Sequence, residues 1–209
     1  MIVIYFLAAL VATFAGSSWI DYLYRLPTAP LSFPEKIHGS NKFRKIFLTV
    51  TFFAAIIHCA EMSTIQAIYY LTAIFFLTLI TVTDFEQYII FDKMLLPFAG
   101  IGIIFSMLMK FSLTNHLTAA FIGGAIFYAL MVVTKNGIGG GDVKLVAVLG
   151  LWLGIDGLSS FILSATVIAG VVVVILLLTK IKSRKDFFAY GPYFCISAAG
   201  YLLFDLKIL

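Results

Sequence analysis

Charged residues are scarce in this chain of 209 residues. Only 11% of the residues are charged, 62% are hydrophobic, and the mean hydropathy is +1.09. A soluble domain typically has about 25% charged and about 45–50% apolar residues. So few polar groups cannot cover this apolar surface in water, which excludes an ordinary soluble domain and a disordered tail. The composition predicts an integral membrane protein.

Cysteine is equally rare. Cys59 and Cys195 stand far apart in apolar runs, and no CxxC pair occurs. This spacing supports neither a structural zinc site nor a disulfide framework, so we expect no metal. The apolar residues also form unbroken runs and do not alternate with polar ones, which argues against a transmembrane β-barrel.

The apolar runs predict about eight transmembrane helices, since a helix needs roughly 20 mostly apolar residues to cross a bilayer. The candidates are residues 2–20, 46–60, 65–83, 94–109, 117–134, 143–155, 157–179 and 187–204. No Lys or Arg precedes the first run, so we interpret it as a span and not as a cleaved signal peptide. The predicted fold class is therefore all-α, in a polytopic membrane protein.

The basic residues predict the orientation of these spans. Of the 14 lysines and arginines, all but Lys110 and Lys207 fall on one side of an eight-span membrane domain. Cytoplasmic loops carry the excess of basic residues, so both termini are expected outside. We assign the basic runs to topology and to contact with the lipid bilayer, and we expect no nucleic-acid partner despite the net charge of +4.

The chain has one sizeable polar segment, at about residues 25–45, which contains Pro27, Pro30 and Pro34. It is too short to form a domain of its own. We therefore expect a short cytoplasmic loop within a single membrane-embedded domain that covers residues 1–209.

Two of the ten acidic residues stand out against this topology. Asp84 in ITVTDFEQYII and Asp142 in NGIGGGDVKLV both fall at cytoplasmic ends of predicted spans. A lone acid at a helix end is more often a cap, but an ionisable group near the bilayer is a functional candidate. Two neighbouring carboxylates share one proton, so one can activate water while the other polarises a carbonyl. The pair fits aspartyl proteolysis.

Glycine is concentrated directly before Asp142, at Gly137, Gly139, Gly140 and Gly141. A backbone without side chains lets an extended peptide approach an acid closely. A flexible turn between two helices would use glycine as well, and glycine content alone leaves both interpretations open.

Four segments, in the same order along most of the chain, resemble the type IV prepilin peptidases, which are polytopic GxGD aspartyl proteases. Residues 137–145 (GIGGGDVKL) resemble the GxGxGDxKL signature, and residues 16–27 (GSSWIDYLYRLP) resemble GSFxNxxxYRLP. Asp84, followed by Asp92, resembles the segment with the first catalytic Asp. Residues 190–193 (YGPY) resemble the FGP element.

The resemblance implies an endopeptidase that removes the short basic leader from prepilins and pseudopilins at the cytoplasmic face of the bacterial inner membrane. It makes Asp84 and Asp142 the catalytic pair, with no cofactor for proteolysis. Lys144, two residues after Asp142, is a further candidate, either for substrate contact or for biasing the ionisation of the pair, with a snorkelling lysine as the alternative. Glu86 and Asp92 are candidates for binding the basic leader, with solvated side chains as the alternative.

The sequence also departs from the family pattern. Many members methylate the new N-terminus with S-adenosylmethionine, and many have a long first cytoplasmic loop with two zinc-binding CxxC pairs. The segment 25–45 has no cysteine, so the chain resembles a reduced form. We expect little or no methylation, and S-adenosylmethionine as a cofactor only if that activity is retained. Asp21 replaces the family's Asn, and Arg25 either pairs with Asp21 or contacts a lipid headgroup.

A small ion-coupled transporter is the alternative from another functional class, since it would also use buried acids. Such a protein has its acids near mid-membrane, in broken helices. Asp84 and Asp142 instead fall at span ends on one side, and the sequence shows no internal symmetry. The sequence therefore favours the peptidase.

Overall fold

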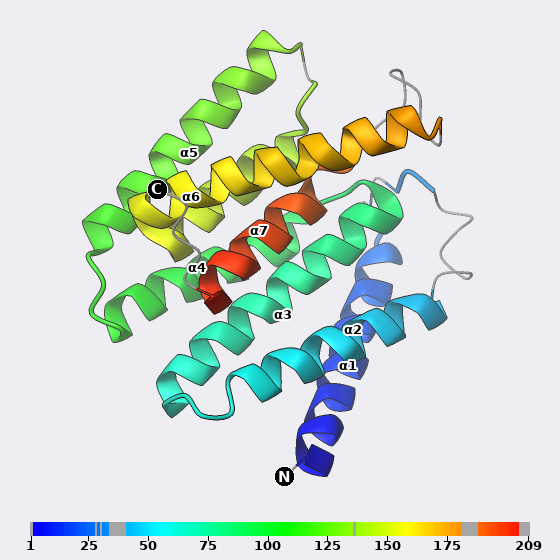
Figure 1. Cartoon of the computed structure of the whole chain (residues 1–209), viewed down its shortest axis with the longest axis vertical. Helices are drawn as coiled ribbons and strands as arrows, with labels where there is room; N and C mark the ends of the chain where they lie inside the picture. Colours follow the sequence, from blue (N-terminus) through cyan, green and yellow to red (C-terminus); the bar gives the residue numbers. More distant parts are fainter. Residues whose placement is uncertain are drawn as a thin grey trace. The chain divides into compact units, whose positions relative to one another are not determined.

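The computed structural model describes residues 2–27, 29, 31–33, 41–135, 137–180 and 188–204. Within these ranges the chain forms α-helices and no strand, which confirms the all-α prediction (Figure 1). The helices are α1 (Ile2–Tyr24), α2 (Asn41–His58), α3 (Thr64–Gln87), α4 (Asp92–Leu108), α5 (Leu113–Val133), α6 (Gly140–Leu178) and α7 (Gly191–Phe204).

Four of these helices, α1, α3, α5 and α6, are long and apolar enough to cross a bilayer. Each predicted span overlaps a helix, and residues 143–155 and 157–179 both lie in α6. The number of about eight spans and the outward orientation of both termini stay predictions. Because α2 begins at Asn41, Lys42, Arg44 and Lys45 lie on a helix and not in the predicted loop at 25–45. Most of the remaining loop lies outside the described residues.

The chain divides into two compact units, an N-terminal unit (Met1–Phe91) and a C-terminal unit (Asp92–Leu209). In the N-terminal unit α1, α2 and α3 pack against one another, whereas in the C-terminal unit α4, α5 and α7 all contact α6. The indole of Trp152 on α6 stacks on Phe98 of α4 with ring centres 4.8 Å apart. Its N–H also donates to the Phe98 carbonyl at 3.0 Å, so the one polar atom of this buried ring is paired.

Helix α6 is interrupted at Gly154, whose φ of 67° and ψ of −176° suit only glycine. In an unbroken helix the N–H of Ile155 would donate to the carbonyl of Leu151. Here the Ile155 N–H donates to Asn115 Oδ1 at 2.8 Å. The Leu151 carbonyl lies 2.8 Å from Nδ1 of His116. Two adjacent side chains of α5 thus replace the lost helical hydrogen bond: Asn115 provides the acceptor for the Ile155 N–H, and His116 contacts the Leu151 carbonyl.

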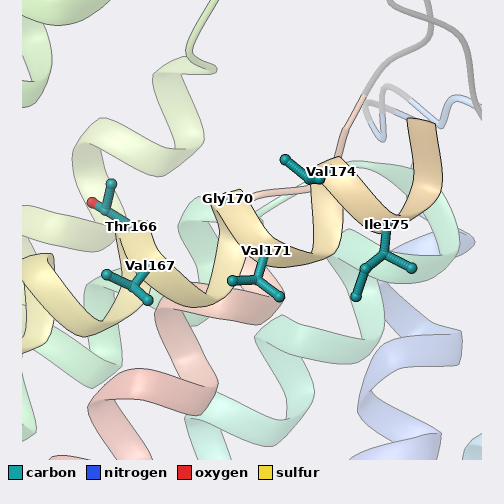
Figure 2. A pocket seen from close by; sticks show the side chains of 6 residues that line it. All are labelled: Thr166, Val167, Gly170, Val171, Val174 and Ile175. Atoms are coloured by element: carbon teal, nitrogen blue, oxygen red, sulfur yellow. The ribbon is translucent and has the colours of Figure 1, made fainter. Parts of the chain in front are cut away.

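An exposed apolar face follows this break along α6. Figure 2 shows its side chains, which all come from the one helix: Thr166, Val167, Gly170, Val171, Val174 and Ile175. A contiguous apolar surface of this kind is unusual for a monomer in water. It is consistent with contact between this part of α6 and lipid chains.

Substituting Gly154 tests the requirement for glycine at the break. We expect Gly154→Ala to lower the free energy of unfolding by about 1–3 kcal/mol, because its φ is unfavourable for alanine and the new Cβ would lie 2.6 Å from Asn115 Oδ1. Equilibrium unfolding in mixed detergent micelles measures the change. Gly100→Ala in α4 is the matched control, since a Cβ there meets no atom within 4 Å. The control should be neutral or stabilising by up to about 1 kcal/mol, and equal losses in both variants would contradict the requirement.

Candidate active site

Asp142 lies in the first turn of α6, where the glycine-rich segment ends. Gly139 precedes the helix in an extended conformation, and its N–H donates to Asp142 Oδ2 at 3.3 Å. The first N–H groups of a helix have no partner within the helix, and they favour an acid at this position. Asp142 is only 8% exposed. Its carboxyl group is therefore held at one end of a long apolar helix.

The glycine-rich segment before Asp142 is open to solvent along most of its length. Gly137, Gly139 and Gly140 are exposed and Gly141 is half-buried. A Cβ at Gly140 would meet no atom within 4 Å. Among the described glycines only Gly154 has a positive φ. The segment therefore does not use the left-handed conformations of a tight glycine turn, and this favours the bare-backbone interpretation over the flexible turn.

Asp84 lies in the last turn of α3 and is 5% exposed. The helix ends at Tyr88, which has a left-handed conformation with a φ of 54° and donates its N–H to the Asp84 carbonyl at 2.9 Å. Asp84 belongs to the N-terminal unit and Asp142 to the C-terminal unit. Their pairing stays a prediction.

Lys144 and Asp92, which the sequence analysis treated separately, form an ion pair within the C-terminal unit. Lys144 Nζ lies 2.8 Å from each carboxylate oxygen of Asp92. The two side chains are 57% and 58% exposed, so solvent screens their attraction. Asp92 is thus already paired with a cation, but only weakly.

A buried polar cluster in the N-terminal unit was missed by the sequence analysis. The Arg44 side chain is fully buried, and its Nε and Nη2 donate to the two oxygens of Glu86 at 2.9 and 2.8 Å. Its Nη1 donates to Asp21 Oδ1 at 2.6 Å. The hydroxyl of Tyr24 donates to Glu86 Oε2 at 3.0 Å. We call these four residues the Arg44 cluster.

The Arg44 cluster changes the interpretation of two sequence candidates. Both oxygens of Glu86 are engaged, which favours a structural role over the predicted contact with a basic leader. Asp21 pairs with Arg44 and not with Arg25. The predicted topology held a signal for this: Asp21 and Glu86 follow the first and third spans and Arg44 precedes the second. The predicted orientation therefore brings all three residues to one membrane face.

Metal-ligating side chains are not grouped in the described part of the chain. No set of three or more His, Cys, Asp or Glu residues there is arranged to hold a metal ion. Cys59 and Cys195 are both buried, and neither forms a disulfide. The candidate site residues that the structure describes offer carboxyl groups, the Lys144 ammonium group and exposed backbone.

A model of the type IV leader peptidase family matches residues 71–175, which is half of the chain and includes both Asp84 and Asp142. The chain belongs to this family. The match extends from α3 into α6, so it covers the helices that hold the two acids.

Curated relatives carry the name prepilin leader peptidase/N-methyltransferase. Those from Xanthomonas campestris pv. campestris and Neisseria gonorrhoeae are 30% and 32% identical over 138 and 135 residues, or 62% of this chain. The relative from Legionella pneumophila is 29% identical over 142 residues, or 64% of the chain. The matches cover 46%, 45% and 49% of these relatives, so the chain spans about half of their length. No solved structure matches the chain significantly.

The two ion pairs should differ in their contribution to stability. Lys144→Met is expected to change the free energy of unfolding by less than about 1 kcal/mol, because solvent screens an exposed pair. Arg44→Met should cost about 3–5 kcal/mol, since it leaves Asp21 and Glu86 without their cation. Equilibrium unfolding in mixed micelles compares the two variants, and similar losses would contradict the assigned burial.

Proposed function

We propose that this protein is an aspartyl endopeptidase that removes the short basic leader from prepilin or pseudopilin substrates at the cytoplasmic face of the bacterial inner membrane. The observation that carries the proposal is the family match, which includes both Asp84 and Asp142. Both acids are buried at helix ends, and one directly follows an open glycine-rich backbone. These features suit a carboxyl pair acting on an extended peptide.

In the proposed reaction Asp84 and Asp142 hold one proton between them. The ionised carboxylate takes a proton from water, whose oxygen bonds to the carbonyl carbon, while the protonated carboxyl group donates a hydrogen bond to the carbonyl oxygen. The tetrahedral intermediate then collapses, the C–N bond breaks, and the leaving amine takes a proton from the pair. The step consumes one water and needs no cofactor.

The surroundings of Asp142 suggest how the substrate is held. The extended substrate backbone lies along Gly137, Gly139, Gly140 and Gly141, where side chains do not obstruct it. The substrate's apolar helix stays in the lipid bilayer.

The basic leader has a candidate partner in the C-terminal unit. A leader cation binds Asp92 in exchange for Lys144, and the exchange costs little because the existing pair is exposed. Glu86 is not assigned to leader binding, since both of its oxygens are engaged within the Arg44 cluster.

The ion-coupled transporter is the weaker alternative. Membership of a leader peptidase family does not favour it. Asp84 and Asp142 also lie in the last and first turns of their helices, whereas a transporter holds its acids in the unwound middle of a span.

Replacing either acid tests the proposed chemistry. Asp84→Asn and Asp142→Asn should each reduce prepilin cleavage by the reconstituted protein to background, because an amide neither accepts the proton of water nor shares one with its partner. Cleavage is followed by the mobility shift of the substrate. Asp156→Asn, an exposed acid of α6, is the matched control and should cleave at the wild-type rate. Normal cleavage by either active-site variant would overturn the pair.

Methyl transfer provides a separate test. With prepilin and radiolabelled S-adenosylmethionine, we expect cleavage but little or no label on the new N-terminus. The reason is that segment 25–45 lacks the cysteine-rich loop associated with the family's second activity. One of the longer relatives named as an N-methyltransferase serves as the positive control. Stoichiometric labelling of the mature pilin would contradict the expectation.

A further inference from the structure

Three helix ends in the N-terminal unit carry charges that their own helices disfavour. Asp21 lies in the last turn of α1 and Glu86 in the last turn of α3, where unpaired carbonyl groups already supply negative charge. Arg44 lies in the first turn of α2, where unpaired N–H groups supply positive charge. Each placement is unfavourable alone, but together they are complementary, because the Arg44 guanidinium lies against both carboxylates.

The contact between Arg44 and Glu86 is directional as well as electrostatic. Nε and Nη2 form a planar fork that matches the two carboxylate oxygens, and a lysine ammonium cannot reproduce this arrangement. The guanidinium carbon also lies 5.4 Å from the centre of the Tyr24 ring. The orientation of the Glu86 carboxylate is thus fixed by two parallel bonds and by the Tyr24 hydroxyl.

Gln87, the next residue of α3, is held by a second polar contact. Its Nε2 donates to the carbonyl of Phe33 at 2.9 Å, and the Phe33 N–H donates to its Oε1 at 2.8 Å. Gln87 is 1% exposed. The Tyr88 ring contacts the Phe33 ring edge-on, with centres 5.5 Å apart. The last turn of α3 is therefore attached both to Arg44 and to the backbone at Phe33.

Asp84 lies in this same turn. Successive residues of a helix are about 100° apart, so Glu86 points about 200° and Gln87 about 300° around the axis from Asp84. Glu86 thus lies nearly opposite Asp84, whereas Gln87 lies only about 60° from it on a neighbouring side of the turn. The hydrogen bonds of the two attachments are made by the side chains of Glu86 and Gln87. They fix the backbone from which the Asp84 carboxyl group extends.

We propose that Arg44 is a positioning residue of the peptidase. It joins α1 to α3 through Asp21 and Glu86, and it thereby holds the last turn of α3 in the orientation that Asp84 requires for catalysis. The catalytic part of this inference rests on the proposed function. The structural part, the restraint of the turn by Arg44, stands independently of any activity.

A spin label next to Asp84 tests the structural part. Phe85 is 70% exposed, so Phe85→Cys accepts a nitroxide label in a background with Cys59→Ala and Cys195→Ala. We expect Arg44→Gln to increase the mobility of the label, and Arg44→Lys to give an intermediate spectrum because it keeps the charge but loses the fork. A spectrum of Arg44→Gln identical to that of the parent overturns the inference, even if its activity falls.

Steady-state kinetics in the unlabelled protein test the catalytic part. Arg44→Gln should lower kcat for prepilin cleavage by about 10- to 100-fold through misplacement of Asp84, with KM changed by less than about twofold. Wild-type kcat in Arg44→Gln overturns the catalytic part. Lys42→Gln is the matched control, an exposed cation in the same turn of α2, and should leave kcat and the label spectrum unchanged.

A third variant covers the case in which Arg44→Gln does not fold. Asp21→Asn, Arg44→Met and Glu86→Gln combined remove all three charges at similar volume, so no buried charge is left unpaired, and an unpaired charge is the main cost of the single substitution. This variant should show the same increase in label mobility and the same loss of kcat, and parental values overturn the inference. A wild-type protein that cleaves no prepilin contradicts the proposed function alone, since the label reports on the turn without any activity.

Discussion

A guanidinium buried among apolar helices must have carboxylate partners, and the N-terminal unit is organised by this constraint. Removing a charge from water costs several kcal/mol unless a partner compensates it. Arg44 has two partners, Asp21 on α1 and Glu86 on α3. The three helices therefore have to meet at the ends that bear these residues. Asp84 is held by the same arrangement because it shares the last turn of α3 with Glu86.

In the C-terminal unit the same need for partners applies to backbone groups. Irregular backbone in apolar surroundings persists only where its N–H and carbonyl groups find partners. At the break in α6 those partners are Asn115 and His116. In both units the few polar side chains thus form hydrogen bonds or ion pairs with groups that the helices leave unpaired. The acids proposed for catalysis lie next to such places, Asp142 at a helix start and Asp84 at a helix end.

Local patterns were sufficient for much of the fold and for the choice of acids. Unbroken apolar runs predicted the helices, and the break at Gly154 falls close to the boundary between the predicted spans 143–155 and 157–179. Asp84 and Asp142 stood out because acids are rare in this chain and because short motifs surround them. The Asp92–Lys144 and Arg44–Glu86 pairs were not predicted. Their partners are 52 and 42 residues apart, and a local motif does not identify a partner at such a distance.

The sequence by itself determined that the described residues form helices, that several of these helices are apolar enough to span a membrane, and which acids are candidates for catalysis. This was possible because the length of an apolar run and the small number of charged residues in it are properties of a short stretch of the chain. Only the tertiary structure decided that Glu86 faces a buried cation, that Lys144 covers Asp92, and that the glycines before Asp142 form open backbone without a positive φ. The physical reason is that a side chain's partner depends on which helices pack together. Which helices pack together depends in turn on whether each buried charge and each buried backbone group of the unit finds a partner.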